Sequence, residues 1–365
     1  MSGKIAWWQP ELGASEQARV AQVIASNYIN DGDVTGQFER EIAKLAGAKF
    51  GVGVTSGTSA IYLSLVALGV GHGDEVIVPD ITFIATANAA SMGGGKVVLV
   101  DADPRTLNIS VAAMEAAITA KTKAVVPVHV SGRGADMEAI LRVCDARGIA
   151  VVEDAAEALC SRHKDRGLGT FGRTGCFSFS PNKTITTGQG GVIVTDDEHV
   201  FQRLRELKDQ GRPVRGTGGD DSHPTLGFNF KLTNLQAAVG LGQLEKLSER
   251  LGRIRRTYSI YRDELGGVAG IRVLQFDLDH GEQPQWVDAL AERRNELDAF
   301  LAKNGAGCRR FWFPLHTQKP YLRDDADFPN STRFCKDAIW LPSAFQMTDS
   351  DVLHVCGLIR KFYGA

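Results

Sequence analysis

The sequence has no long hydrophobic run and no excess of charge of either sign. No uncharged apolar stretch reaches the ~18 residues that indicate a membrane-spanning helix. The 41 Lys and Arg residues nearly balance the 43 Asp and Glu residues, for a formal net charge of −2. Nucleic-acid-binding domains and polybasic membrane binders usually carry a clear basic excess. The composition therefore argues against a nucleic acid or a membrane as partner.

Cysteine pairs and targeting signals are also missing. The six cysteines include no CxxC pair and no zinc-type spacing, and the eight histidines show no ligand-type pairing. The first residues, MSGKIAWWQPELG, lack the basic and then apolar segments of a secretory signal. We therefore expect a cytoplasmic protein with reduced thiols and no metal site.

Two common nucleotide-binding motifs are absent as well. The sequence contains no GxxxxGK[ST], the Gly51–Gly53 spacing does not fit GxGxxG, and the glycines of residues 69–73 follow a helical pattern instead of a strand. Glycine itself is abundant, with 40 of 365 residues. This abundance indicates tight turns or places where the backbone approaches another group closely.

The first half of the chain alternates short apolar runs with helical patterns. The apolar runs are Gly51–Val54, Glu75–Val78, Lys96–Asp101, Lys123–Val128, Ile149–Glu153, Gly175–Phe179 and Gly191–Thr195. The helical patterns are Thr58–Leu68, Ile84–Ser91, Val111–Thr119 and Asp136–Arg147. This alternation predicts an α/β fold with a mostly parallel sheet covered on both faces. A loop instead of a helix joins the last two runs, so we expect the sheet to be less regular there.

The second half is organised differently. After a helical pattern at Glu198–Gln210 comes a long loop rich in Gly, Pro and charge, residues 211–224, and then a helical pattern from Thr233 to Tyr261. The remainder holds a strand-like run at Ile271–Phe276 and helical patterns at Ala291–Lys303 and Asp349–Phe362. We expect a large α/β domain over residues 1–248 and a smaller α+β domain over residues 249–365.

Three segments combine into a candidate site. Lys183 lies in a loop of Pro, Asn, Thr and Gly between two expected strands. A single lysine is usually a solvated surface charge. A lysine that is desolvated in such a loop could instead act as a nucleophile. Asp154 follows an apolar strand, where it could cap a helix or bind a ligand at the sheet edge. The segment TSGTSA, residues 55–60, opens a helix after a strand, as an ordinary cap or as an anion site.

These parts together match the needs of one cofactor. A nucleophilic lysine, a carboxylate for a ring nitrogen and a phosphate cradle are what pyridoxal 5′-phosphate (PLP) requires. Phe83 could stack on the cofactor ring, although an aromatic residue there could equally be part of the core. The separate segments therefore point to a PLP site.

At this point the sequence resembles the fold-type I PLP enzymes, and more closely the DegT/DnrJ/EryC1/StrS family of nucleotide-sugar aminotransferases. The resemblance covers nearly the whole chain. Its motifs are SGTSA at Ser56, GDEVIVPDITFIATANA at Gly73, HVSGRGADM at His129, EDAAEALC at Glu153, FSFSPNKTITTGQGG at Phe177, GFNFKLTNLQAAVGLGQL at Gly227, FPLH at Phe313 and WLPS at Trp340.

The resemblance implies a role for each matching residue. Lys183 corresponds to the lysine that binds PLP as a Schiff base, Asp154 to the partner of the pyridine nitrogen, and Glu157 to a position near the phenolic oxygen. Phe83 corresponds to the residue that stacks on the cofactor ring. The residues that correspond to phosphate contacts are Ser56, Gly57, Thr58 and Ser178. Asn229 corresponds to one that reaches the cofactor of a neighbouring subunit. The resemblance thus implies a homodimer with shared active sites. His316, Arg309, Arg212 and Arg215 fall where the family contacts the sugar nucleotide.

The resemblance also implies the reaction. We expect a ping-pong transamination from glutamate, released as 2-oxoglutarate, to a nucleotide-diphosphate 4-keto-6-deoxy sugar, in the biosynthesis of an amino sugar for a surface polysaccharide. The loop NKTITTG is similar to that of members that aminate C4 of the sugar. A C3 keto-sugar or amino-cyclitol aminotransferase and a non-catalytic PLP-fold binding protein are the alternatives. A PLP-dependent 3-dehydratase of similar fold carries histidine at the position of Lys183, so the lysine argues against that reaction.

Overall fold

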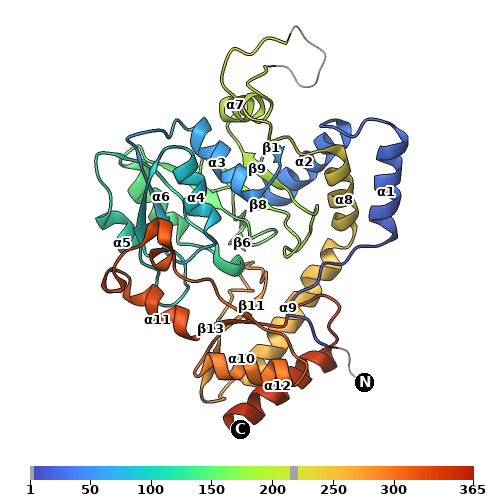
Figure 1. The fold of residues 1–365 in the computed structure, drawn as a ribbon, viewed down its shortest axis with the longest axis vertical. Helices are drawn as coiled ribbons and strands as arrows, with labels where there is room; N and C mark the ends of the chain where they lie inside the picture. The colour runs from blue at the N-terminus through green and yellow to red at the C-terminus, as the bar shows by residue number, and fades with distance from the viewer. Residues whose placement is uncertain (1–3, 214–220) are drawn as a thin grey trace.

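The computed structural model describes residues 4–213 and 221–365, and its upper part in Figure 1 is built on a seven-stranded sheet. The strands run in the order β1-β9-β8-β5-β4-β2-β3. The five neighbouring strands β8, β5, β4, β2 and β3 pair in parallel, each with the next, whereas β9 is antiparallel to both β8 and β1. The strands are β1 (Phe50–Val54), β2 (Glu75–Pro79), β3 (Lys96–Val100), β4 (Thr122–Val125), β5 (Ala150–Asp154), β8 (Thr174–Ser178) and β9 (Gly191–Thr195). The expected mostly parallel sheet is confirmed.

Helices cover both faces of this sheet because successive strand residues point to opposite sides. Val76 and Val78 of β2 belong to the apolar cluster under α3 (Gly57–Ala67), α4 (Ala85–Met92) and α7 (Glu198–Lys208), whereas Ile77 packs on the other side with α5 (Val111–Ala116) and α6 (Met137–Asp145). Further along that second side lie α2 (Asp33–Ala46) and α8 (Asn234–Glu245), and α1 (Ala14–Ala25) packs on α8. The first two helices, α1 and α2, were not among the predicted elements.

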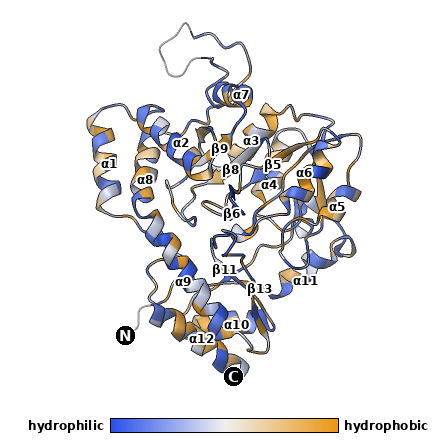
Figure 2. Ribbon diagram, turned by 180° about the vertical axis from the view of Figure 1, so that it is seen from behind, coloured by the Kyte–Doolittle hydropathy of each residue, from blue (hydrophilic) through white to orange (hydrophobic). Residues whose placement is uncertain are grey.

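A second, antiparallel sheet occupies the lower part of the molecule in Figure 1. Its order is β10-β11-β13-β12, with β10 (Ile271–Val273), β11 (Val287–Ala291), β12 (Arg309–Arg310) and β13 (Ala338–Leu341). The helices α9 (Leu247–Leu265), α10 (Arg294–Lys303) and α12 (Asp349–Tyr363) share an apolar core with this sheet, and α11 (Pro329–Asp337) precedes β13. Figure 2 shows polar and apolar residues mixed along α9 and α12, as expected for helices with one face on a core.

The long helical pattern predicted from Thr233 to Tyr261 is two helices in the structure. Helix α8 ends at Glu245 and α9 begins at Leu247, with Lys246 at the junction. The two helices serve different cores, because α8 packs on α1 and α2 whereas α9 packs on α12 and the second sheet. We retain as a proposal the division into domains at residue 248, one residue into this second helix.

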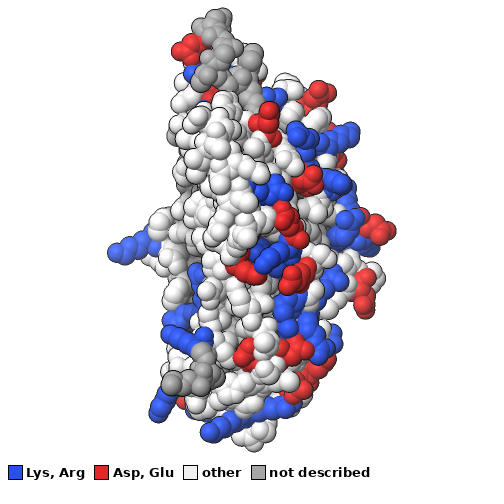
Figure 3. All heavy atoms as spheres, turned by 90° about the vertical axis from the view of Figure 1, so that its right-hand side faces the viewer, with Lys and Arg blue, Asp and Glu red and all other residues white. Residues whose placement is uncertain are grey.

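The surface agrees with the balanced composition. On the side shown in Figure 3, acidic and basic residues are interspersed, and neither sign covers the face alone. None of the helices within residues 4–213 and 221–365 is long and apolar enough to cross a membrane.

Candidate active site

A cavity of about 340 Å³ lies between the two sheets. Its first wall comes from the large sheet and carries polar groups, Ser56, Gly57, Thr58, Asp154, Glu157, Ser178 and Lys183, together with the ring of Phe83. Its second wall comes from the second sheet and neighbouring segments and is aromatic, with Trp286, Trp312, Trp340 and Arg309. We call these the polar wall and the aromatic wall. The polar wall lies at the carboxyl end of β5, where ligands of parallel sheets bind.

The N-terminus of α3 forms one part of the polar wall. Ser56 caps this helix, because its Oγ accepts the Ser59 N–H at 3.1 Å while Ser59 Oγ accepts the Ser56 N–H at 2.9 Å. The N–H groups of Gly57 and Thr58 precede the first intrahelical bond and remain for a ligand. A Cβ on Gly57 would lie 2.8 Å from Cβ of Ser178, so only glycine allows this approach. The arrangement suits a phosphate group.

Asp154 is the last residue of β5, and its side chain is held on both oxygens. Thr86 donates its hydroxyl to Oδ2 at 2.7 Å, and the Ala156 N–H donates to Oδ1 at 3.1 Å. Residues 155–160 form turns, so the carboxylate does not cap a helix as the alternative interpretation proposed. Burial raises the pKa of Asp154, and the Thr86 hydrogen bond and the charge of Lys183 partly oppose that rise. Such a carboxylate favours a cationic partner.

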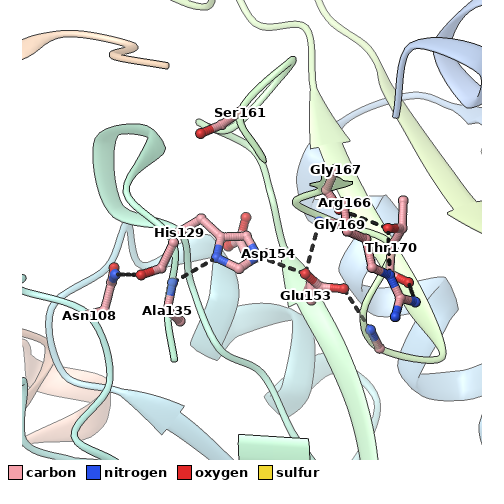
Figure 4. A network of polar contacts seen from close by, with 12 residues as sticks. Asn108, His129, Ala135, Glu153, Asp154, Ser161, Arg166, Gly167, Gly169 and Thr170 are labelled. Carbon is pink, nitrogen blue, oxygen red and sulfur yellow. Dashed lines mark hydrogen bonds and ion pairs between the residues drawn. The ribbon is translucent and has the colours of Figure 1, made fainter. Parts of the chain in front are cut away.

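A buried polar network fixes the strand end beside Asp154 (Figure 4). The Ala135 N–H donates to Nδ1 of His129 at 3.2 Å, so the imidazole carries its hydrogen on Nε2 and donates it to Glu153 at 2.8 Å. Glu153 also accepts the N–H of Gly169 at 2.8 Å and of Gly172 at 2.6 Å. Glu153 is adjacent in sequence to Asp154 but faces away from the cavity.

Lys183 lies on the loop between β8 and β9 and lines the cavity. Its Nζ donates to Oε1 of Glu157 at 3.1 Å and lies 4.9 Å from the ring centre of Trp286. The Ser131 N–H holds the other Glu157 oxygen at 2.9 Å. Burial raises the pKa of Glu157, and the Lys183 charge opposes that rise. The lysine therefore faces one carboxylate and one aromatic face.

The loop that carries Lys183 is tied to the second sheet. Gln285, which precedes β11, accepts both the N–H of Thr184 at 3.2 Å and its hydroxyl at 2.8 Å. The amide nitrogen of Gln285 donates to the Asn182 carbonyl at 3.4 Å. Because Gln285 is buried, these contacts fix the lysine loop from the side of the aromatic wall.

Phe83 lies at the cavity with 54% of its side chain exposed, which leaves a ring face free for stacking. The positions of Trp286 and Trp312 on the cavity were not predicted from the sequence, and Trp340 was expected only as part of a motif. A lone tryptophan gives no signal that separates a cavity wall from a core position. Among the described residues, no three His, Cys, Asp or Glu side chains group as a metal site.

The structure places His316 outside the lining of the cavity, and the expected contact with the substrate stays a prediction. The side chain is fully buried, with Nδ1 at 2.6 Å from Asp80, Nε2 at 3.1 Å from Asp325, and its ring stacked on Phe328. Both ring nitrogens face carboxylate oxygens. His316 therefore has no free group for a substrate in this structure.

Two other expected residues, Asn229 and Arg212, also lie outside this cavity's lining. Asn229 pairs through its backbone with Asp209 in an isolated β-bridge. Arg212 forms an ion pair with Asp221 at 2.8 Å. Arg215 lies outside the described residues. Of the three described residues expected to contact the sugar nucleotide, Arg309 lines the cavity, and His316 and Arg212 do not.

A lysine and a carboxylate that meet at the carboxyl end of a mostly parallel sheet, under a smaller antiparallel domain, define the class of fold-type I aminotransferases. Residues 10–360 match the model of the DegT/DnrJ/EryC1/StrS aminotransferase family, and the chain belongs to that family. Aminotransferases of this family use PLP, and the donor groups of the polar wall fit that cofactor. The resemblance stated from the motifs is thereby confirmed.

Individual relatives cover nearly the whole chain. A GDP-perosamine synthase from Escherichia coli O157:H7 is 35% identical over 361 residues, covering 98% of each chain. A GDP-perosamine synthase from Caulobacter vibrioides is 36% identical, covering 96% of each. The crystal structure of DesV from S. venezuelae matches with a TM-score of 0.90 and 32% identity, covering 96% of this chain and 94% of that chain. DesI, solved with its TDP-sugar product, matches with a TM-score of 0.91 and 29% identity, covering 100% and 93%.

Proposed function

We propose that this aminotransferase moves an amino group from glutamate to C4 of a nucleotide-linked 4-keto-6-deoxy sugar, as a GDP-perosamine synthase does, to supply an amino sugar for a surface polysaccharide. The observation that carries the proposal is the joint placement of Lys183, Glu157 and Asp154 in one cavity. The sugar class is supported by relatives named GDP-perosamine synthase at 32–36% identity over nearly the full chain.

The cofactor, when bound, supplies an electron sink for the carbanion that forms at the reacting carbon. We propose that Lys183 Nζ is the group that would take the proton from the donor's Cα, as general base, and would deliver it to C4′ of the cofactor, as general acid. Glu157 holds Nζ in place through the hydrogen bond at 3.1 Å. Asp154 holds a proton on the ring nitrogen, because its buried carboxylate gains most from a cationic partner.

The remaining groups of the polar wall position the cofactor. The N–H groups of Gly57 and Thr58 and the hydroxyls of Ser56 and Ser178 would hold its phosphate. Phe83 would stack on one face of the ring. These residues do no proton transfer; they fix the ring so that Lys183 faces the reacting carbon.

We also propose a homodimer in the cytoplasm with active sites shared between subunits. Asn229 and the arginines at 212 and 215 would then serve the neighbouring subunit's site. The location of Asn229 and Arg212 outside their own chain's cavity supports this assignment. A monomeric form would lack these groups and should be inactive.

The test is the visible absorption spectrum of the PLP-loaded protein. Glutamate should bleach the band of the lysine-bound cofactor, and GDP-4-keto-6-deoxymannose should restore it, whereas Lys183→Ala should form no such band. Restoration only by a 3-keto sugar nucleotide or a keto-cyclitol would move the function to those alternatives. A band that neither glutamate nor another amino donor bleaches would contradict transamination and favour the binding-protein alternative.

A further inference from the structure

Residues 5–8 are remote in sequence from every element of the cavity, yet main-chain hydrogen bonds fix them beside it. The Ile5 N–H donates to Gly305 at 2.8 Å, and the Gly307 N–H donates back to Ile5 at 2.8 Å. The Ser343 N–H donates to the Trp7 carbonyl at 3.0 Å. These bonds attach the N-terminal segment to the turns that lead into β12 and out of β13. Trp7 and Trp8 are thereby directed toward the aromatic wall.

Trp8 contacts both the loop that carries Lys183 and the ring of Trp286, which faces the lysine. Its Nε1 donates to the Pro181 carbonyl at 3.2 Å, two residues before the lysine in the same loop. Its ring also packs at right angles against Trp286, with 6.4 Å between ring centres. Trp286 is the ring that faces Lys183 Nζ at 4.9 Å. Trp8 thus restrains the lysine loop from outside the cavity.

Trp7 contacts the cationic group of the aromatic wall. The Arg309 guanidinium lies 4.8 Å from the Trp7 ring centre and 5.5 Å from that of Trp340. Arg309 lines the cavity, and among the described residues it has no ion-pair partner. The Trp7 Nε1 is buried without a hydrogen-bond partner among the described residues, so the contribution of this side chain is its ring. Arg309 is therefore presented to the cavity with no partner for its N–H groups in the part of the chain that the structure describes.

We propose that residues 5–8 are a working part of the active site, with a separate task for each tryptophan. Trp8 positions the Lys183 loop, and Trp7 orients Arg309 toward an anionic group of a substrate, either the donor carboxylate or the nucleotide diphosphate. Both are positioning residues, since neither lines the cavity. The Arg309 half of the inference rests on the proposed function, whereas the Lys183 half requires only that PLP binds.

The experiment compares three variants of the full-length, PLP-loaded protein. Trp8→Phe removes the indole N–H and keeps an aromatic ring. Trp7→Leu removes the ring face under Arg309 and keeps apolar bulk. Gln346→Ala removes a contact of the residue that follows this segment, the 3.5 Å bond from Gln346 to the Gln9 carbonyl, and controls for general loosening. Thermal unfolding shows that each variant is folded.

Two measurements that need no turnover separate the tasks. The first is the rate of PLP release together with the pH midpoint of the cofactor band. The second is the dissociation constant for succinate, a dicarboxylate that cannot be transaminated, and for GDP. Trp8→Phe should accelerate PLP release about three- to tenfold and shift the midpoint, as expected for one lost hydrogen bond. Trp7→Leu should raise the dissociation constant for succinate or for GDP about two- to fivefold, as expected for one lost cation–π contact.

Each variant should leave the other measurement within about twofold of wild type, and Gln346→Ala should leave both unchanged. If Trp7→Leu binds succinate more weakly, the anionic group that Arg309 contacts is the donor carboxylate. If it binds GDP more weakly, that group is the nucleotide diphosphate. Wild-type PLP release and midpoint in Trp8→Phe, or wild-type affinity for both anions in Trp7→Leu, would overturn the proposal. Equal effects of all three variants on both measurements would also overturn it, since they would show loosening alone. A wild-type enzyme that binds PLP but does not transaminate would contradict the proposed function and leave the Trp8 result interpretable.

Discussion

The polar and aromatic walls of the cavity are built in different ways. The polar wall uses residues at the ends of β1, β5 and β8, each within a short motif whose backbone needs are visible locally. The aromatic wall collects Trp286, Arg309, Trp312 and Trp340 from separate segments of the second sheet, with Trp7 and Trp8 behind them. Cofactor chemistry thus belongs to contiguous motifs, whereas the space left for a substrate depends on contacts between distant segments.

The strongest test of this comparison uses two adjacent carboxylates. Asp154 faces the cavity, and Glu153 faces the buried network with His129. Asp154→Asn should reduce kcat roughly 10²- to 10³-fold, the usual effect of removing one preorganised electrostatic partner. Thr86 can still donate to the amide oxygen, whereas the Ala156 N–H then faces the amide NH2 group, so we also expect a loss of about 1 kcal/mol in the free energy of unfolding.

Glu153→Gln is the matched control. It weakens the acceptor for His129 and two backbone N–H groups, so we expect a loss of about 1–3 kcal/mol in the free energy of unfolding. Activity per folded molecule should stay near wild type. Steady-state kinetics and urea unfolding measure the two effects. A Glu153→Gln variant that unfolds normally but loses activity as Asp154→Asn does would show that both carboxylates belong to the site.

A second comparison, of folding stability, should separate His316 from the substrate contacts. His316→Leu leaves Asp80 buried without its partner, and breaking a buried pair in this way costs about 3–5 kcal/mol. Asp325→Asn removes the exposed partner of the same ring and should cost less than about 1 kcal/mol. Urea unfolding of both variants checks the difference. Normal stability with a raised KM for the sugar nucleotide in His316→Leu would return His316 to the substrate contacts.

The His316→Leu deficit should also grow with pH. Burial already raises the pKa of Asp80, and His316 opposes that rise through its hydrogen bond and charge. Without His316 the folded state keeps the Asp80 proton to a higher pH than the unfolded state does. Stability is then lost as the pH rises from about 4 toward the raised pKa. Unfolding at pH 5 and pH 8 should show the larger deficit at pH 8.

The same comparison explains what the sequence could predict. Lys183, Asp154 and Gly57 were recognised because each follows or precedes an apolar strand whose ends converge at one sheet edge. Strand β11 was missed because Asp288 interrupts its apolar pattern, and this charge is tolerated by a buried pair with Arg133 that no local rule reveals. The buried position of His316 was not predicted for a related reason, since its carboxylate partners lie 236 and 9 residues away. Local sequence patterns therefore do not predict buried polar residues such as Asp288 and His316, whose partners lie elsewhere in the chain.

The smallest expected effect concerns the one cation of the aromatic wall. Arg309 and Arg310 are neighbours on β12, but Arg309 lines the cavity whereas Arg310 donates to Asn295 at 2.8 Å. Arg309→Gln should raise the KM for an anionic substrate about tenfold, because a charge-assisted hydrogen bond to an anion is replaced by a neutral one. Arg310→Gln should leave KM unchanged. Comparing the KM for glutamate with that for the sugar nucleotide shows which anion Arg309 contacts. If Arg309→Gln and Arg310→Gln have the same KM values for both substrates, Arg309 does not contact an anionic group of either substrate. Arg309 would then be removed from the proposed site, and the aromatic wall would select substrates by shape.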